Sequence, residues 1–120
     1  MPARQHRVTR GDDYRRIVRT GRRVGGAYCI THAVSRIQGE PARFGFIVSK
    51  AIGNAVTRNL IRRRMKTVAD RRLADGLSGV DIVFRALPAI ADAPFGELER
   101  ELNRAIDRAC RPSAEGRSSR

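Results

Sequence analysis

The sequence is poor in aromatic and sulfur-containing side chains. It has no tryptophan, two tyrosines, four phenylalanines and two cysteines in 120 residues. Any stacking surface on this chain must therefore be sparse. The two cysteines, Cys29 and Cys110, form no CxxC pair and no Cys/His cluster, which argues against a zinc site. Two thiols in so small a domain are typical of a reducing cytoplasm, where neither needs a disulfide bond.

Long apolar runs are also absent. No stretch approaches the roughly 18 apolar residues of a membrane span, and the N-terminal segment MPARQHRVTRGDDY lacks the apolar core of a secretory signal. A basic protein of the membrane surface is disfavoured as well, because no tryptophan and no strongly apolar face accompany the basic clusters. We therefore expect a cytoplasmic protein without a membrane partner.

Positive charge is what the chain has in excess. The formal net charge is +13 and the sequence pI is about 11.6, with 25 Lys and Arg against 12 Asp and Glu. A charge of this size opposes the compact state unless a partner neutralises it, and nucleic acid is the commonest such partner. Arginine far outnumbers lysine, which favours forked contacts to phosphate and stacking on bases, although a GC-rich genome also raises the arginine content.

The hydrophobic periodicity indicates a single α+β domain. Alternating segments predict strands over 27–34, 43–49 and 79–87. Amphipathic segments predict one helix within 7–23 and two more over 54–73 and 94–110. This order of helix, strands, helix, strand, helix is typical of an α/β sandwich with a split β-α-β unit. We expect the domain to cover 1–111 and residues 112–120 to form a disordered basic tail.

Local signals predict the helix ends and the core. Asp12 or Asp13 is expected to cap the first helix, which Gly21 ends, and Asn54 and Gly76 bound the second. All four phenylalanines are assigned to the core, together with a buried stripe on the last helix: Phe44, Phe46, Phe84, Phe95, Leu98, Leu102, Ile106 and Ala109. Residues 81–110 carry four Arg and six acids. Because its charges nearly balance, the last helix is expected only to pack.

The segment SKAIGNAVTRNLIRRRMK, residues 49–66, carries six cations and no acid. A helical wheel places Ile61, Met65 and Val68 on a core stripe. A polar, cationic arc lies on the other side, with Arg58 and Arg64 at its flanks and Leu60 exposed: Asn59, Arg62, Arg63 and Lys66. Charge runs usually form solvated faces, but those mix signs. Here like charges one turn apart repel by about 0.2–0.5 kcal/mol per pair, so an anionic partner is favoured.

The stretch VSKAIGNAVTRNLIRRRMK resembles the signature of the protein subunit of bacterial ribonuclease P, in which a strand runs through VSKK-x-GNAV-x-RNR-x-KR into a basic helix. The segments RVTRGDDYRRIVRTGRR, RFGFIVSK and VDIVFRALPA are similar to further parts of that family, so the resemblance covers most of the chain. Two positions depart from the pattern. Ala51 replaces the second lysine of the Lys-Lys pair, and Leu60 replaces the last arginine of Arg-Asn-Arg.

The resemblance implies a protein that binds a large catalytic RNA and assists endonucleolytic removal of the 5′ leader from precursor tRNA. Hydrolysis is then carried out by the RNA and its Mg²⁺, which the RNA subunit mainly binds, with no catalytic or metal-binding residue in the protein. The contacts to the catalytic RNA are assigned to basic and polar residues of the signature and of the N-terminal segment: Lys50, Arg58, Asn59, Arg62, Arg63, Arg64, Lys66, Arg7 and Arg10. The turn Gly53-Asn54 either brings backbone N–H groups near a phosphate or is only a helix cap.

The resemblance also implies a shallow cleft between the first helix and the sheet that holds the single-stranded leader. Candidates for its lining are Tyr14, Val18, Tyr28, Ile30 and His32, of which the last three alternate along one strand. Tyr14, Val18, Tyr28 and Ile30 could equally belong to the core. Without base-reading elements, binding is expected to depend on backbone, shape and salt.

Three other functions compete with this prediction. A ribosomal protein or RNA chaperone of similar, ribosomal-protein-like fold shares the charge but not the long signature. A stand-alone nuclease needs a protein active site, yet His6, His32 and Asp81 have no convincing catalytic partner. A DNA-binding module is disfavoured because no helix-turn-helix pattern is visible.

Overall fold

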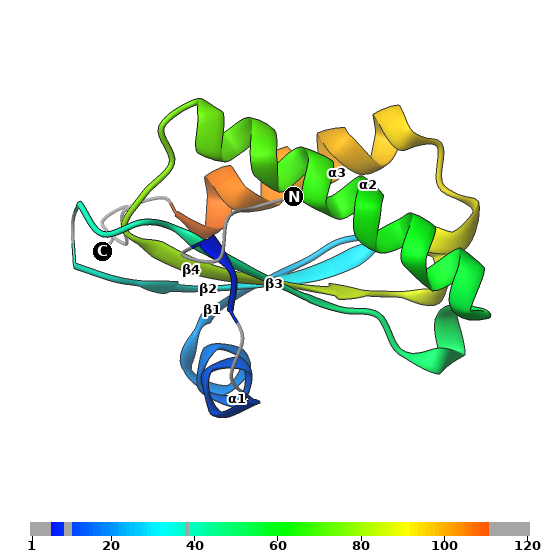
Figure 1. The fold of residues 1–120 in the computed structure, drawn as a ribbon, viewed down its shortest axis with the longest axis horizontal. Coiled ribbons are helices and arrows are strands. Elements are labelled where there is room, and N and C mark those ends of the chain that lie inside the picture. Colours follow the sequence, from blue (N-terminus) through cyan, green and yellow to red (C-terminus); the bar gives the residue numbers. More distant parts are fainter. Residues whose placement is uncertain (1–5, 9–10, 38, 111–120) are drawn as a thin grey trace.

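The computed structural model describes residues 6–8, 11–37 and 39–110 (Figure 1). Its elements follow one another in the order α1 (Gly11–Thr20), β1 (Arg22–Gly25), β2 (Cys29–Ser35), β3 (Arg43–Ile47), η2 (Lys50–Ile52), α2 (Ala55–Ala74), β4 (Val80–Ala86), η3 (Pro88–Asp92) and α3 (Phe95–Ala109). The predicted tail, 112–120, lies outside the described residues.

The four strands form one sheet in the order β1-β2-β4-β3. The β1–β2 and β2–β4 pairs are antiparallel, whereas β3 and β4 are parallel and joined by α2. Figure 1 shows α1 alone on one face of the sheet and α2 and α3 together on the other. Each face of the sheet is therefore covered, but the α1 face only in part, because a ten-residue helix is short.

The predicted α+β class is confirmed, with two corrections to its detail. Strand β1 was not predicted: its residues 22–25 follow Gly21, the predicted end of the first helix, and were assigned to no strand. The β-α-β unit is not split, since β3 and β4 are direct neighbours and no strand lies between them. The parallel pairing follows from the 20-residue helix α2, which is long enough to return the chain to the same end of the sheet.

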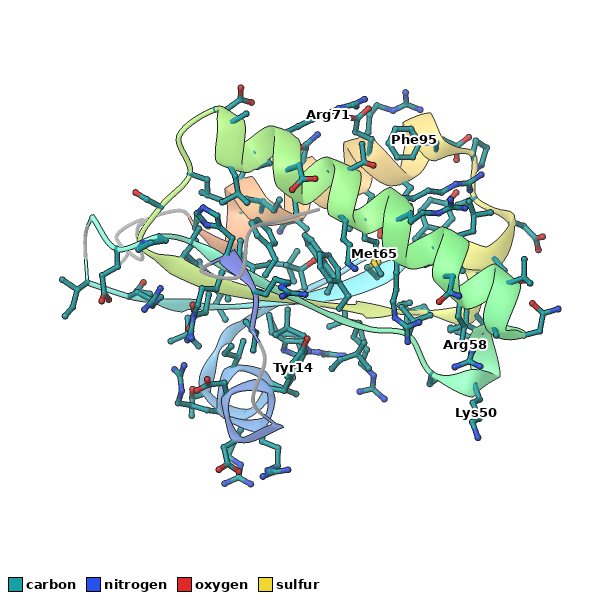
Figure 2. All side chains as sticks on the ribbon, viewed as in Figure 1. Tyr14, Lys50, Arg58, Met65, Arg71 and Phe95 are labelled. Atoms are coloured by element: carbon teal, nitrogen blue, oxygen red, sulfur yellow. The ribbon has the colours of Figure 1, made fainter. Side chains whose placement is uncertain are left out.

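The main core lies between the sheet and the α2–α3 layer. The stripe residues Ile61, Met65 and Val68 are buried as predicted, and Met65 points toward the sheet in Figure 2. The predicted stripe of α3 is buried too: Leu98, Leu102, Ile106 and Ala109. Of the four phenylalanines, Phe44 and Phe84 are buried, and Phe46 and Phe95 pack partly buried against this core. Both cysteines are free, and burial raises the pKa of the Cys29 thiol to about 12.

The local caps of α2 are confirmed. The Asn54 side-chain oxygen accepts a hydrogen bond from the Thr57 N–H (2.9 Å), and Gly76 follows the helix with φ of 98°, a conformation that glycine adopts without strain. The expected cap of α1 is wrong, because the helix begins at Gly11 and both Asp12 and Asp13 lie inside its first turn. Acidic side chains there still interact favourably with the helix dipole.

A buried carboxylate at the start of β4 fixes α1 on the sheet. Asp81 is fully buried and accepts two hydrogen bonds from Arg43 (2.9 and 2.7 Å) and one from Arg16 of α1 (3.1 Å). Arg36 lies 3.5 Å away. Burial acts to raise the pKa of Asp81, but the hydrogen bonds and charges of these arginines outweigh it and hold the pKa below its ordinary value. Asp13 and Glu40 pair with the same arginines, so three acids in all offset the three positive charges.

Candidate nucleic-acid interface

The approach to α2 places two cations on an exposed corner of the molecule. Lys50 is exposed in η2. Arg58 lies in the first turn of α2, near Lys50 in Figure 2. The Arg58 guanidinium donates through Nε to the Gly53 carbonyl (3.2 Å). This bond holds the side chain beside the 3-10 turn and leaves its two terminal NH₂ groups available to an anion.

Further along α2, Arg62 is held in place by its neighbours. It donates one hydrogen bond to the Asn59 side-chain oxygen (3.2 Å) and a longer one to the Val48 carbonyl (3.5 Å). Lys66 follows one turn later on the same side of the helix. Within the described part of the chain, none of Arg58, Arg62 and Lys66 forms a salt bridge with a carboxylate. Their charges are therefore not neutralised by described acids.

Arg62 and Lys66 face a hollow at the β3 edge of the sheet, which we call the edge hollow. It has a volume of about 210 Å³ and is lined by Arg7, Val8, Tyr14, Phe44, Phe46, Arg62 and Lys66. The N-terminal segment reaches it because Val8 N–H donates to the Phe44 carbonyl (2.9 Å) and so adds to the β3 edge. The first helix, the edge strand and the basic helix thus meet at one place.

A second hollow lies between α1 and the sheet, and we call it the helix hollow. It has a volume of about 330 Å³ and is lined by Tyr14, Arg15, Val18, Arg19 and Ile47. Tyr14 and Val18 are one helical turn apart, as are Arg15 and Arg19, so α1 presents an apolar and a cationic pair side by side. An apolar floor with cationic walls suits a strand of nucleotides with unpaired bases.

Tyr14 separates the two hollows and is fixed by contact with β3. Its ring lies directly over Gly45, where an added Cβ would be 2.6 Å from the ring carbon Cε1. The Phe46 N–H also donates to the Tyr14 hydroxyl oxygen (3.3 Å). Only a glycine lets the ring approach the strand so closely, and Figure 2 shows Tyr14 pointing from α1 toward the sheet.

Similarity to known proteins identifies the family of this chain. The family model described as Ribonuclease P matches residues 1–110. The chain belongs to the ribonuclease P protein family. The ribonuclease P protein component of Clavibacter michiganensis subsp. michiganensis is 46% identical over 111 residues, which is 92% of this chain and 98% of that protein. The one from Beutenbergia cavernae is 43% identical over 103 residues, 86% of each chain.

Two experimental structures share the fold. The RNase P protein of Staphylococcus aureus matches with a TM-score of 0.79 at 24% identity, covering 88% of this chain and 95% of that one. The RNase P protein of Thermotoga maritima matches with a TM-score of 0.76 at 20% identity, covering 85% and 96%. Membership of the ribonuclease P family gives this chain a general role in tRNA processing, as a component that accompanies an RNA subunit.

The signature residues of this ribonuclease P protein do not all point the same way. Arg63 is exposed on α2. Arg64 instead donates to the Ala93 carbonyl (3.2 Å) and so connects α2 to the short segment between η3 and α3. Leu60 is 38% exposed, as the wheel predicts, and Ala51 is exposed in η2. Arg10 lies outside the described residues.

The predicted leader residues of β2 are divided between the two faces of the sheet. Ile30 and His32 lie on the α1 face, where His32 is opposite Val83, which packs under α1. His32 is only 4% exposed, and burial, with the charges of Arg23 and Arg85, lowers the pKa of its ring. The ring is therefore expected to be neutral at pH 7.

The expectation that Tyr28 shares this face is wrong. Tyr28 precedes β2, packs against the main core on the α3 side and donates its hydroxyl hydrogen bond to Glu97 (2.8 Å). Side chains alternate between the two faces of the sheet only within β2, and Tyr28 still belongs to the turn before that strand. The backbone N–H groups of residues 27–29 all donate to the Glu101 carboxylate, which sets their direction.

Four arginines near the hollows were not identified from sequence. Arg15 and Arg19 line the helix hollow, whereas Arg23 and Arg85 flank the exposed part of the same sheet face, opposite His32 and Ile30 in the strand register. The spacing of Arg15 and Arg19 beside Tyr14 and Val18 is a signal that a wheel of the first helix could have detected. The position of Arg85 depends on strand pairing, which one strand does not reveal.

Proposed function

We propose that this ribonuclease P protein binds the catalytic RNA subunit with the exposed and half-buried cations around α2, and receives the 5′ leader of precursor tRNA in the helix hollow. The RNA contacts are assigned to Lys50, Arg58, Arg62, Arg63 and Lys66, with Arg7 at the edge hollow. Arg64 is assigned a secondary part, because its hydrogen bond to Ala93 commits it to the contact between α2 and the segment before α3.

The α2 cations suit phosphate binding because several are already oriented. Arg58 and Arg62 are restrained by the carbonyls of Gly53 and Val48 and by Asn59, so less side-chain freedom is lost when a phosphate binds. Asn59 accepts from Arg62 through its oxygen and keeps its NH₂ group for a phosphate or a ribose hydroxyl. Gly53 and Asn54 act as the turn and cap that begin the helix.

The helix hollow suits an unpaired leader because it combines one ring, apolar side chains and cations. Tyr14 offers a stacking surface, Val18 and Ile47 the apolar floor, and Arg15 and Arg19 the contacts to phosphate. Ile30, with Arg23 and Arg85, extends this face beyond α1. Tyr28 is left out because it lies on the α3 side.

The chemistry is assigned to the RNA subunit and the Mg²⁺ that it binds. Among the described residues, no group of three His, Cys, Asp or Glu side chains gathers where a metal ion could be held. Asp81, the one fully buried carboxylate of the described core, is engaged by three arginines. We assign to the protein the part of positioning RNA and leader.

The observation that carries the proposal is the place of Tyr14, which lines both hollows. A leader that stacks on Tyr14 comes within reach of the hollow where Arg62 and Lys66 meet the catalytic RNA. One side chain thereby connects the two RNA ligands. The membrane plays no part in this proposal, and no helix of the described chain is long and apolar enough to span one.

Reconstitution with the RNA subunit at low Mg²⁺ tests the proposal. Arg62→Gln with Lys66→Gln is expected to weaken binding of the RNA subunit about 10-fold or more, since charge-assisted hydrogen bonds contribute about 1.5–3 kcal/mol each. Tyr14→Ala is expected to weaken binding of leader-bearing precursor tRNA by about 1–3 kcal/mol, the range for one stacked base. Mature tRNA without a leader should bind to the Tyr14→Ala holoenzyme as it does to the wild type.

A control with equal loss of charge separates specific contacts from net charge. Ala74→Glu with Ser78→Glu lowers the charge by the same two units at exposed positions away from both hollows, and should change RNA affinity far less. Unchanged RNA affinity in the Arg62/Lys66 variant would exclude the α2 surface. Cleavage of precursor tRNA by protein free of RNA would exclude an RNA-centred active site.

A further inference from the structure

The outer face of α3 carries three exposed arginines in one line. Arg100, Arg104 and Arg108 are four residues apart, so they lie one above the other and extend over about 12 Å of helix. Like charges at this spacing repel one another in an isolated helix. In the described part of the chain, none of the three is joined to a carboxylate by a salt bridge. We call them the α3 arginines.

The acids of α3 that could neutralise this line are engaged elsewhere. Glu101 accepts hydrogen bonds from three successive backbone N–H groups, those of Ala27 (2.8 Å), Tyr28 (2.9 Å) and Cys29 (2.9 Å). Glu97 accepts the Tyr28 hydroxyl (2.8 Å). Both carboxylates therefore stabilise the turn that leads into β2.

The remaining acids of α3 bind α2. Glu99 pairs with Arg71, whose guanidinium also lies over the Phe95 ring at 5.7 Å, a contact visible in Figure 2. Asp107 pairs with Arg72 (2.7 Å). The four acids of α3 thus all bind other parts of the protein, whereas Arg100, Arg104 and Arg108 form no salt bridge among the described residues.

The α3 arginines also border hollowed surface. Arg100 and Arg104 line a hollow of about 350 Å³ together with Ala27, Tyr28 and the two hydrogen-bonded carboxylates Glu97 and Glu101. Arg104 and Arg108 line another of about 210 Å³ beside Gly25, Gly26 and Glu101. The small residues of the β1–β2 turn leave room for a ligand next to the arginine side chains.

This surface lies at the opposite edge of the sheet from the α2 cations. Helix α3 packs over β1 and β2, whereas α2 packs over β3, and these strands are at the two ends of the order β1-β2-β4-β3 (Figure 1). The helix hollow is on the other face of the sheet. A segment of RNA bound at the edge hollow or the helix hollow therefore does not reach the α3 arginines. A different segment of RNA is needed to contact them.

We propose that the α3 arginines are a second RNA-binding surface, which binds the phosphate backbone of a double-helical segment of the RNA subunit. This inference rests on the proposed function, since it takes the RNA subunit as the partner. A double-helical segment is favoured because the arginines form a straight, rigid line. Single strands need several stacking rings, whereas among the described residues lining these hollows Tyr28 alone is aromatic, and it is half-buried and held by Glu97.

The test compares four variants of the full chain for RNA-subunit affinity over a range of salt concentrations. Arg100→Gln/Arg104→Gln/Arg108→Gln should weaken binding at least about 10-fold and reduce the salt slope by about 2, because each lost phosphate contact lowers it by about 0.7–0.9. The corresponding triple Lys variant keeps the charge and should bind within about 3-fold of the wild type. Ile37→Glu/Ala74→Glu/Ser78→Glu lowers the charge equally at exposed positions elsewhere and should weaken binding much less.

The fourth variant, Arg62→Gln/Lys66→Gln, distinguishes failure of this inference from failure of the proposed function. In RNA footprinting, it should lose protection in one segment, and the α3 Gln variant in a different, double-helical one. RNA affinity of the α3 Gln variant equal to that of the wild type, or to that of the charge-matched control, would overturn the inference while the α2 result stands. Loss confined to precursor tRNA would also overturn it. Absence of RNA-subunit binding by the wild type would instead refute the proposed function.

Discussion

Gly45 determines where the Tyr14 ring lies, and the contact can be tested by a double-mutant cycle. In Gly45→Ala the new methyl group would stand 2.6 Å from Cε1 of the ring and 2.8 Å from both Cζ and the hydroxyl oxygen. These distances are too short for any stable contact, so the ring must move away from β3. We expect the single variant to keep its fold and to lose the position of Tyr14.

The magnitude follows from two opposing effects. Overpacking of this kind costs about 1–3 kcal/mol. Replacing glycine by alanine at a compatible backbone conformation stabilises the fold by about 0.4–1 kcal/mol, because alanine restricts the unfolded chain. Gly45 has such a conformation, since its φ is not positive. Gly45→Ala should therefore destabilise the wild type by about 0–2.6 kcal/mol, the difference between the two effects.

The same substitution should act differently without the ring. In a Tyr14→Ala background nothing opposes the new methyl group, so Gly45→Ala should be neutral or stabilising by up to about 1 kcal/mol. Urea unfolding of the wild type, the two single variants and the double variant gives the coupling energy, expected at about 1–3 kcal/mol. Tyr14→Phe serves as the control background, because it keeps the ring carbons and should retain the coupling.

Leader binding provides the functional readout. Displacement of the ring should weaken binding of precursor tRNA with a leader and leave the affinity for the RNA subunit unchanged. If Gly45→Ala destabilises both backgrounds equally, to within about 0.5 kcal/mol, the ring does not lie on Gly45. The account of Tyr14 as the residue shared by both hollows would then be wrong.

Two carboxylates, the buried Asp81 and the half-buried Glu101, give further predictions. Asp81→Asn should cost about 3 kcal/mol, the lower end of the range for breaking a buried ion pair, because its arginine partners are partly exposed to water. Because the pKa of Asp81 is lowered in the folded state, its stabilising contribution is present above the ordinary value of 3.8 and lost as the pH falls through the lower folded value. Urea unfolding between pH 2 and 5 should therefore show a smaller pH dependence in Asp81→Asn than in the wild type. Glu101→Gln should cost about 1–3 kcal/mol, since an amide oxygen cannot satisfy three donors, and should speed hydrogen exchange of the amides at 27–29, whereas Glu99→Gln should leave that exchange unchanged.

Features that depend on neighbouring residues were predicted correctly from sequence. Asn54 caps α2 because its own side chain reaches the N–H group three residues later. Ile61, Met65 and Val68 are buried because a helix repeats every 3.6 residues and places them on one side. Leu60 is exposed for the same reason. No distant contact is needed for any of these results.

Features that depend on pairing across the chain were missed or misplaced. Strand β1 has only four residues and exists because β2 pairs with it. Tyr28 faces α3 because Glu101, 73 positions away, binds its backbone N–H. Asp12 and Asp13 lie inside α1 rather than at its cap, and Asp13 lies within 3.8 Å of both Arg16 and Arg43.

The sequence by itself determined that the chain is strongly cationic, that its longest basic segment is a helix with one buried side, and that its signature is that of the ribonuclease P family. Only the tertiary structure decided which charges remain available. Arg16, Arg36 and Arg43 share the buried Asp81 and also pair with Asp13 or Glu40, whereas the acids of α3 bind the β2 turn and α2 and leave the α3 arginines without a salt bridge among the described residues. A sequence gives the number of charges, but the folded chain determines their partners, because the strongest partners lie far apart along it.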